Sequence, residues 1–413
     1  MTDVLFARAQ MGISLGFHIV FAVIGIAMPV LMVLAEWRHH RTGDPEYLEL
    51  AKTWGKGTAV FFAVGAVSGT ALSFELGLLF PTFMRHAGPV VGLPFSLEGV
   101  AFFTEAIFLG VYLYGWDKVS RRVHVFAGIM VSLSGFFSAA FVTVANAWMN
   151  APRGFRYEGG AFVDVDPVAA MKTPFAVHEV LHMSLAAYMT TALAAAALHA
   201  FALLLAVPTT LVQPLVGHHA GQRVAELQPA KMAAMEQLET TQAYAPVEIG
   251  PIRIPGLLSI MAFNRPDAVV RGLADFAPED RPPRAVKPAF QLMAGLGTLL
   301  AGLASWVALK WLRKKPLEDD RTLLRTLVLA GPLGFVALEA GWLVTELGRQ
   351  PWIVYGVLRT NDTVTPMPGL VVPFTLFSTI YLGLGVVVVA VLRRHVQRSI
   401  GEGAAPDPHE EHP

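Results

Sequence analysis

Residues 327–352 read LVLAGPLGFVALEAGWLVTELGRQPW, an apolar run long enough to cross a bilayer that ends in a charged segment with a proline. Glu339, Glu346 and Arg349 therefore fall inside, or at the end of, a predicted membrane helix. Charged side chains at that depth are costly, and those that occur usually face the bundle interior, where they handle protons, ions or a ligand. This stretch predicts a membrane protein with a buried functional site.

The composition of the whole chain agrees with that prediction. Hydrophobic residues make up 54% of the 413 residues, charged residues make up 15%, and the mean hydropathy is +0.52, as expected of a polytopic membrane protein. Basic and acidic residues balance at 31 each, so nothing in the charge indicates a nucleic-acid partner. The absence of cysteine excludes disulfides and thiolate ligands, so any haem must be held by histidine, methionine or an oxygen donor.

Apolar segments of roughly 20 residues, which match the about 30 Å hydrocarbon core, are the predicted membrane spans. Seven of them cover residues 11–35, 54–81, 95–116, 123–149, 288–311, 324–346 and 371–392. Residues 180–222 have no Asp, Glu, Lys or Arg, and a single helix of that length would be about 64 Å long. We expect two short helices at 178–198 and 201–219; the alternative is one long tilted helix with a re-entrant segment near Pro208 and Pro214.

Basic residues in alternate loops predict the topology, because Lys and Arg accumulate in short cytoplasmic loops. The basic residues that we assign to the cytoplasmic side are Arg38, Arg41, Lys52, Lys56, Lys118, Arg121, Arg122, Lys310, Arg313, Lys314, Lys315, Arg321, Arg325, Arg393, Arg394 and Arg398. We therefore predict an all-α, polytopic transmembrane bundle of about nine spans with its amino terminus outside. Helices 1–6 lie in residues 1–220, an extracytoplasmic segment covers 221–287, helices 7–9 lie in 288–395, and a disordered cytoplasmic tail covers 396–413.

Two groups of buried polar residues could carry chemistry. His18 lies in the first span among apolar neighbours, and a neutral imidazole there suits a metal or haem ligand; a hydrogen bond to a neighbouring helix is the alternative. Glu98 and Glu105 are seven residues apart and share one helix face, and Glu75 adds an acid on the preceding span. Stacked carboxylates suit a proton relay, whereas pairing with a hydroxyl or with a buried arginine, Arg8 or Arg349, is the structural alternative.

A third pattern has two interpretations. His178, Glu179 and His182 match the HExxH motif of zinc proteases, but no third ligand follows at a typical spacing, so an intramembrane protease is a minor hypothesis. Met293 lies in the seventh span, where a methionine usually fills the core. With His182 at the same level it could instead complete a His/Met haem site of the electron-transfer type.

Taken together, these segments resemble subunit I of cytochrome bd ubiquinol oxidase over nearly the whole chain. The matching pieces are His18 in LGFHIVF, residues 94–116, 146–149 and 182–188, Gln228–Lys231 with Glu236, Met293, and residues 341–352, of which the last, with GRQPW, is the most specific. The polar segment is of the short quinol-loop type. Gln291 replaces a basic residue found in many members, and this feature is similar to the cyanide-insensitive branch.

The resemblance implies a set of cofactors and site residues. His182 and Met293 would be the axial ligands of a low-spin haem b, and Glu346 would ligate a high-spin haem b. His18 would ligate haem d, or a further haem b in its place, with Glu98 on the other face of that ring. Glu105 would belong to the proton path, Trp342 and Arg349 would lie among the haems, and Lys231 and Glu236 would bind quinol.

The resemblance also implies a function. The chain would be the haem-containing subunit of a terminal quinol:O2 oxidoreductase in the bacterial cytoplasmic (inner) membrane, working as a heterodimer with a second membrane subunit. Quinol would be oxidised at the outer face and O2 reduced to water with cytoplasmic protons, which makes a proton gradient without pumping. A transporter that uses the buried glutamates without haem is the remaining alternative beside the protease.

Overall fold

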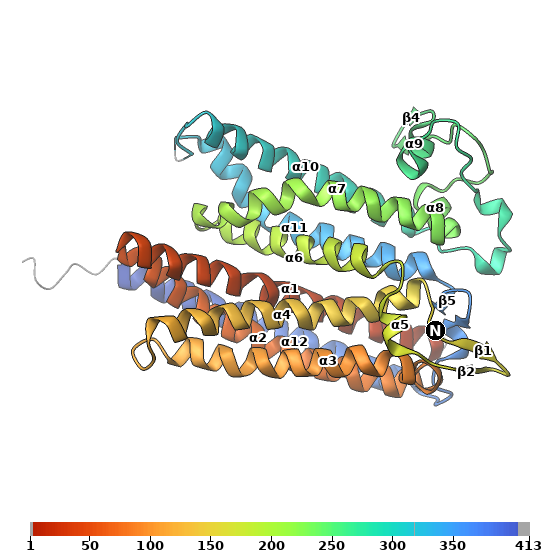
Figure 1. The fold of residues 1–413 in the computed structure, drawn as a ribbon, viewed down its shortest axis with the longest axis horizontal. Helices are drawn as coiled ribbons and strands as arrows, with labels where there is room; N and C mark the ends of the chain where they lie inside the picture. Colours follow the sequence, from red (N-terminus) through yellow and green to blue (C-terminus); the bar gives the residue numbers. More distant parts are fainter. Residues whose placement is uncertain (1–2, 318, 404–413) are drawn as a thin grey trace, which may run out of the picture.

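The chain is a bundle of long helices with short elements gathered at one end (Figure 1). The computed structural model describes residues 3–317 and 319–403. The long helices are α1 (Asp3–Thr42), α2 (Pro45–Leu79), α3 (Pro81–Tyr114), α4 (Arg121–Asn150), α6 (Ala176–Ala196), α7 (Leu203–Leu227), α10 (Val286–Leu312), α11 (Arg321–Arg349) and α12 (Val371–Gly403). Among the described residues, eight helices are long and apolar enough to cross a membrane. Helix α6, whose 21 residues pack against α7 and α11, completes the bundle, so the predicted fold class is confirmed.

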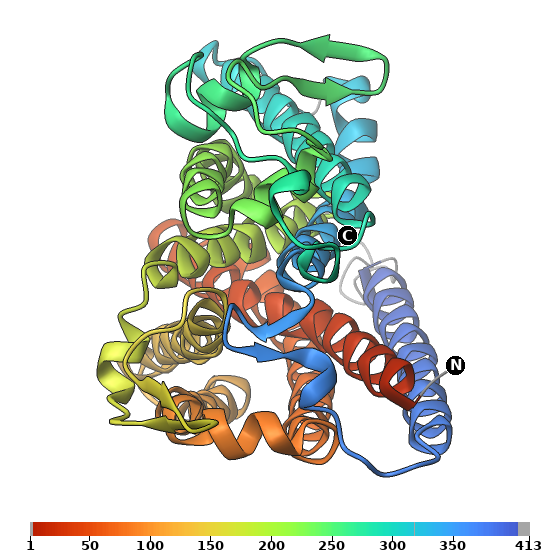
Figure 2. The ribbon, with the colours of Figure 1, turned by 90° about the vertical axis from the view of Figure 1, so that its right-hand side faces the viewer.

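Helix α1 occupies the middle of the bundle (Figure 2). Helices α2, α3, α4 and α12 lie on one side of it, and α6, α7, α10 and α11 lie on the other. The largest group of buried apolar side chains joins α1 to the second set through residues such as Leu31, Leu193 and Leu323. A second group lies near the end with the short elements, around Phe83, Trp148 and Val354.

Proline positions explain why one span was predicted too short. Pro81 starts α3, separated from the end of α2 by the single residue Phe80, and its missing N–H costs nothing there. Pro89 and Pro94 lie inside this helix, and membrane helices tolerate such prolines because neighbouring groups satisfy the freed carbonyls. The prediction that this span begins at residue 95, after the prolines, was therefore wrong by about four turns.

Residues 180–222 form a helical hairpin, as predicted. Helix α6 ends at Ala196, the short 3-10 helix η1 (Ala200–Ala202) makes the turn, and α7 packs back along α6. One continuous helix is thereby excluded. Helix α7 continues to Leu227, so the polar segment begins at Gln228 and not at the predicted residue 221.

The end of the bundle that carries the amino terminus also carries three β-hairpins (Figure 1). They are β1–β2 (Arg156–Glu158, Ala161–Val163), β3–β4 (Val247–Ile249, Ile252–Ile254) and β5–β6 (Trp352–Val354, Leu358–Arg359). The short helices α5 (Pro167–Met171), α8 (Pro229–Glu236) and α9 (Leu257–Phe263) lie at the same end, as do the 3-10 helices η2 (Leu273–Asp275), η3 (Pro278–Asp280) and η4 (Thr360–Asp362). We refer to this end as the hairpin end.

The loops that join α1 to α2, α3 to α4 and α10 to α11 lie at the opposite end, so the basic loops assigned to one side from the sequence are together in space. Helix α12 extends into the predicted tail, because residues 396–403 are helical. The remainder of that predicted tail, residues 404–413, lies outside the described residues.

Glycine 128 marks the tightest helix contact near the basic end. A Cβ added at Gly128 of α4 would lie 2.6 Å from Cγ2 of Val33 in α1 and 2.7 Å from Cε2 of Tyr112 in α3. Small residues at helix crossings allow such close approach in membranes. Because Tyr112 and Val33 come from two different helices, this one position sets the spacing of three helices.

We predict that Gly128→Ala lowers stability by about 1–3 kcal/mol, because a methyl group there forces two helices apart. Gly302→Ala in α10 is the matched control, since nothing lies within 4 Å of a Cβ at that position. Thermal unfolding of the purified complex, followed by loss of the monodisperse peak, should show a lower Tm for the first variant only. Equal Tm values for both variants would contradict this account of the packing.

Candidate functional site

His18 is held with one ring nitrogen engaged and the other free. Its Nδ1 lies 2.9 Å from Oγ of Ser68 in α2, and that hydroxyl donates its own proton to the carbonyl of Val64 (2.8 Å). Ser68 therefore accepts from Nδ1–H, which leaves Nε2 as the unprotonated nitrogen. This is the tautomer that a histidine ligand needs, with a second residue fixing the ring orientation. The predicted alternative, a hydrogen bond to a neighbouring helix, is present and leaves the ligand nitrogen available.

Glycines on adjacent helices make room for all three side chains that are predicted as histidine or methionine ligands. A Cβ at Gly69 would lie 3.0 Å from Cε1 of His18, and one at Gly217 would lie 3.2 Å from Cε1 of His182. A Cβ at Gly341 would lie 2.9 Å from Sδ of Met293. The helix backbones therefore approach these side chains closely and restrict their rotamers, which is how a ligand set is pre-organised.

His182 and Met293 stand at corresponding levels of the bundle. Each is two turns from the start of its helix at the hairpin end, His182 in α6 and Met293 in α10. Gln213 of α7 lies on the Nδ1 side of the His182 ring: its amide nitrogen is 3.3 Å from His182 Nδ1 and donates to the His182 carbonyl (3.1 Å). Gln291 donates to the carbonyl of Glu248 (2.8 Å) and thus anchors the polar segment to α10.

The buried Arg349 pairs with the partly buried Glu346 at the end of α11. Arg349 Nη2 donates to Oε2 of Glu346 (2.7 Å), and Asn146 Nδ2 of α4 donates to Oε1 (2.6 Å). Arg349 is 2% exposed, yet its Nε and Nη1 have no partner among the described residues. Two unpaired donors on a buried guanidinium are costly and fit an anionic group such as a carboxylate.

Trp342 and Glu339, one and two turns before that pair, face α1. A Cβ at Gly16 would lie 3.4 Å from Oε2 of Glu339 and 3.9 Å from the Trp342 ring, two residues from His18. The other oxygen of Glu339 is buried without a partner among the described residues. The sequence placed Glu339 in a membrane helix, and its position beside α1 near His18 is a structural addition.

Glu98 and Glu105 both face α4, as expected for two residues on one helix face. The Glu105 carboxylate is buried against Gly135, where a Cβ would lie 3.3 Å from Oε1, and Glu98 faces the Ser138 hydroxyl three residues along α4. Neither pairs with an arginine, because Arg8 donates to Gln350 (3.0 Å) and Arg349 to Glu346. Glu75 accepts from Gln10 (3.0 Å), and its second oxygen has no partner among the described residues.

Lys231 lies in α8 and reaches the end of α11. Its Nζ donates to the carbonyl of Thr345 (3.3 Å), its side chain packs on Gly348, and it is 4% exposed. Burial lowers the pKa of Lys231 to about 8, and the carboxylates of Glu179 and Glu346 oppose that shift. The predicted quinol residue is thus next to the GRQPW segment.

Glu236 is buried at the other end of α8. Burial raises the pKa of its carboxyl to about 7, against the nearby ammonium of Lys287, which donates to the Glu236 carbonyl (3.0 Å). A carboxyl with a pKa near neutrality can take up and release a proton under ordinary conditions. Lys231 and Glu236 therefore lie at the two ends of one short buried helix.

The HExxH residues do not form a metal site. No three His, Cys, Asp or Glu side chains come together as a metal site within the described part of the chain. Glu179 Oε1 instead accepts from Asn150 Nδ2 of α4 (3.1 Å), and His182 turns to Gln213. Asn150 was missed from the sequence, and Gln228 was named only as part of a matching motif, because neutral amides carry no signal for such contacts until their partners are known.

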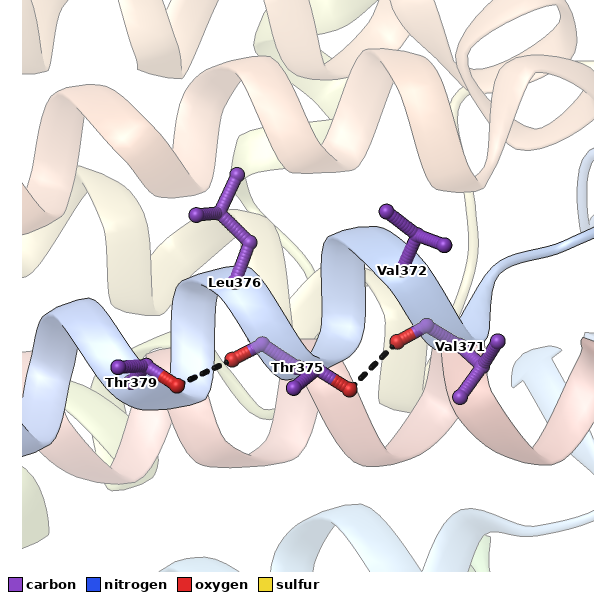
Figure 3. Close-up of a pocket in the computed structure, with 5 residues that line it drawn as sticks. All are labelled: Val371, Val372, Thr375, Leu376 and Thr379. Atoms are coloured by element: carbon purple, nitrogen blue, oxygen red, sulfur yellow. Dashed lines mark hydrogen bonds between the residues drawn. The ribbon is translucent and has the colours of Figure 1, made fainter.

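Two concave surfaces lie outside this cluster. A shallow groove along α12 is lined by Val371, Val372, Leu376 and two threonines (Figure 3). The hydroxyls of Thr375 and Thr379 donate to carbonyls of their own helix (2.8 Å each), so the groove presents methyl groups and suits lipid or an apolar partner. A cleft of about 400 Å³ at the hairpin end is lined by Asn150, Ala151, Pro152, Arg153, Pro174, Leu227 and Tyr355.

Comparison with models of known protein families identifies the family of this chain. The family model described as "Cytochrome bd terminal oxidase subunit I" matches residues 6–400. The chain belongs to this family. The membership confirms the resemblance and the enzyme class, a terminal quinol oxidase, and it decides against the protease and transporter hypotheses.

Similar proteins support the assignment over the full length. The chain is 36% identical to "Putative cytochrome bd menaquinol oxidase subunit I" of Bacillus subtilis, over 95% of this chain and 96% of that protein. It is 25% identical to "Cytochrome bd-II ubiquinol oxidase subunit 1" of Escherichia coli, over 87% and 89% of the two chains. The structure of bd oxidase from Geobacillus thermodenitrificans aligns with a TM-score of 0.90 at 35% identity, over 96% of this chain and 99% of that one.

We predict that Asn150→Ala destabilises the hairpin end. Asn150 is fully buried, donates to Glu179 and Asn146, and accepts from Gln228 (3.1 Å). Without the Asn150 amide, the side chains of Glu179 and Gln228 each lose a hydrogen-bond partner. Each buried polar group left unsatisfied lowers the free energy of unfolding by about 1–3 kcal/mol. The purified complex should show a lower Tm than Gln222→Ala in α7, whose side chain makes long hydrogen bonds to His218 and His219 (3.3 Å each). A Tm equal to that of the control would contradict the role of Asn150.

Proposed function

We propose that this chain is the haem-containing subunit of a quinol:O2 oxidoreductase that oxidises quinol at the hairpin end and reduces O2 to water inside the bundle. The hairpin end faces the outside and the basic loops face the cytoplasm of a bacterial inner membrane. Protons from quinol leave outside and protons for water come from the cytoplasm, so a gradient forms without a pump. The chain works as a heterodimer with a second membrane subunit.

The observation that carries the proposal is the buried Arg349, whose Nε and Nη1 have no partner among the described residues. A haem propionate is an anion that suits such donors, because hydrogen bonds between a guanidinium and a carboxylate are charge-assisted and strong. The free Nε2 nitrogen of His18, the imidazole of His182 and the thioether of Met293 supply neutral donors of the types that hold haem iron. The residues present therefore fit haem.

We assign each donor to a ring as follows. His182 and Met293 would hold a low-spin haem b, Glu346 would hold a high-spin haem b, and His18 would hold haem d or a further haem b at the O2 site, with Glu98 as a second protein group at that site. Each Glu346 oxygen retains a lone pair beside its hydrogen bonds to Asn146 and Arg349. When bound, the haems carry electrons from quinol to O2.

At the quinol site, two side chains of α8, Lys231 and Glu236, have different roles. Lys231 donates a hydrogen bond to a quinol oxygen, and the Glu236 carboxylate accepts a quinol proton and passes it to outer water. Glu236 is ionised above about pH 7 and Lys231 is protonated below about pH 8, so both have the required form near neutral pH.

Protons for water formation approach along α3. This helix begins at the hairpin end and finishes at Tyr114 at the basic end, so Glu105 is nearer to the cytoplasmic side than Glu98. Both carboxyl groups face α4, which gives a proton two successive acceptors on one helix face. Glu98 is near the middle of α3, as His18 is near the middle of α1.

We predict that His182→Ala removes the low-spin haem b signal from the reduced-minus-oxidised spectrum while the other haem signals remain. The reason is loss of one axial ligand, with no change at His18 or Glu346. His199→Ala, in the turn at the opposite end of α6, is the control and should leave every signal in place. A full set of haem signals in the His182 variant would refute the ligand assignment.

A further inference from the structure

Glu179, which the quinol and haem assignments do not use, belongs to a polar network built on Asn150. Asn150 Nδ2 donates to Oε1 of Glu179 in α6 (3.1 Å) and to Oδ1 of Asn146 (2.9 Å), which in turn donates to Glu346 in α11. Gln228 donates to the carbonyl (2.9 Å) and to Oδ1 (3.1 Å) of Asn150. A single buried amide thus connects α4, α6, α11 and the start of α8.

Gln228 ties this network to Lys231. It is the residue before the first turn of α8, and its carbonyl accepts from the backbone N–H of Lys231 (3.0 Å). Gln228 is fully buried, so the start of α8 has little freedom to move relative to Asn150 and Glu179. The position of the Lys231 side chain therefore depends on the same contacts that hold Glu179.

The network encloses two cations and two anions. Lys231 and Arg349 are the cations, and Glu179 and Glu346 are the anions whose charges act on Lys231. Glu346 is bonded directly to Arg349, so Glu179 is the carboxylate left to balance Lys231. Buried charges need such compensation, because an unbalanced charge away from water is costly.

The other charged side chains on neighbouring helices pair with groups other than Lys231. Lys287 of α10 bonds to the Glu236 carbonyl and lies 3.6 Å from Glu248, and Arg223 and Glu226 of α7 form an exposed pair (2.8 Å). The charged groups that face Lys231 are therefore Glu179 from α6 and Arg349 and Glu346 from α11.

We propose that Glu179 is a positioning residue for quinol oxidation: its carboxylate balances the Lys231 ammonium and, through Asn150 and Gln228, fixes the start of α8. This inference rests on the proposed function, in which Lys231 donates to quinol. Glu179 acts through Lys231 and does not touch the substrate. Its place in the HExxH pattern is incidental to this role.

The test uses the pH dependence of quinol oxidation by the purified complex. Burial holds the pKa of Lys231 at about 8, and loss of the opposing carboxylate lowers it further. Glu179→Gln removes the charge but keeps an oxygen for the Asn150 hydrogen bond. The alkaline limb of kcat/KM for quinol should move to lower pH by about one unit, with the haem spectrum unchanged. Glu179→Asp keeps the charge and should leave the limb near its wild-type position.

Two controls make the outcome decisive. His178→Gln changes the adjacent residue, which faces Arg223, His219 and Glu226 and not Asn150, and should not move the limb. Lys231→Ala should abolish this limb, which identifies Lys231 as its source. An unmoved limb in Glu179→Gln, or equal shifts in the Gln and Asp variants, would overturn the role of Glu179 while leaving the proposed function standing. A wild-type complex that does not oxidise quinol would instead overturn the proposed function.

Discussion

Burial of the Arg349 guanidinium at the end of α11 is the constraint on which the hairpin end depends. A cation in this position needs anions and acceptors on every side, and the chain supplies them from helices distant in sequence: Glu346 by direct pairing, Asn146 by orienting Glu346, and Glu179 by compensating the neighbouring Lys231. The two donors of Arg349 that have no partner among the described residues, Nε and Nη1, are costly to leave unpaired, and one more anionic group would pair with one of them. We propose that a haem propionate is this group.

Close helix packing provides the second half of the site. His18, His182 and Met293 each lie against a glycine of an adjacent helix, at Gly69, Gly217 and Gly341. A polar side chain also lies beside Nδ1 of both histidine rings, Ser68 at His18 and Gln213 at His182, and limits how each ring can turn. The pattern explains why small residues appear among large apolar ones in these spans, where they would otherwise only weaken the helices.

Much of the fold could be predicted from the sequence because the bilayer imposes length and composition on each span. The hairpin of α6 and α7 followed from the 43 uncharged residues of 180–222, and the grouping of basic loops followed from charge alone. The start of α3 was missed, since Pro89 and Pro94 indicate a helix end in water but not inside a bundle. Individual candidate site residues were singled out where charge is unexpected, as for Glu346, Arg349 and Glu105, and their roles stay predictions.

The contacts between those residues could not be predicted, because they are made across long sequence separations. Lys231 belongs to a polar segment, and only the return of α8 onto α11 places it beside Thr345 and Gly348. Asn150 and Gln228 carry no charge, so their joint role with Glu179 depends on three-dimensional packing alone. Gln291, which stands where many members of the family have a basic residue, anchors the polar segment through the carbonyl of Glu248.

The most direct test of this account is an experimental density map of the purified heterodimeric complex around Arg349. The account predicts a porphyrin with a propionate that accepts from one of the two free donors of Arg349, Nε or Nη1, with Glu346 beside the same ring. A map in which those two donors meet only water or protein carbonyls, with no porphyrin between α4, α6 and α11, would contradict it.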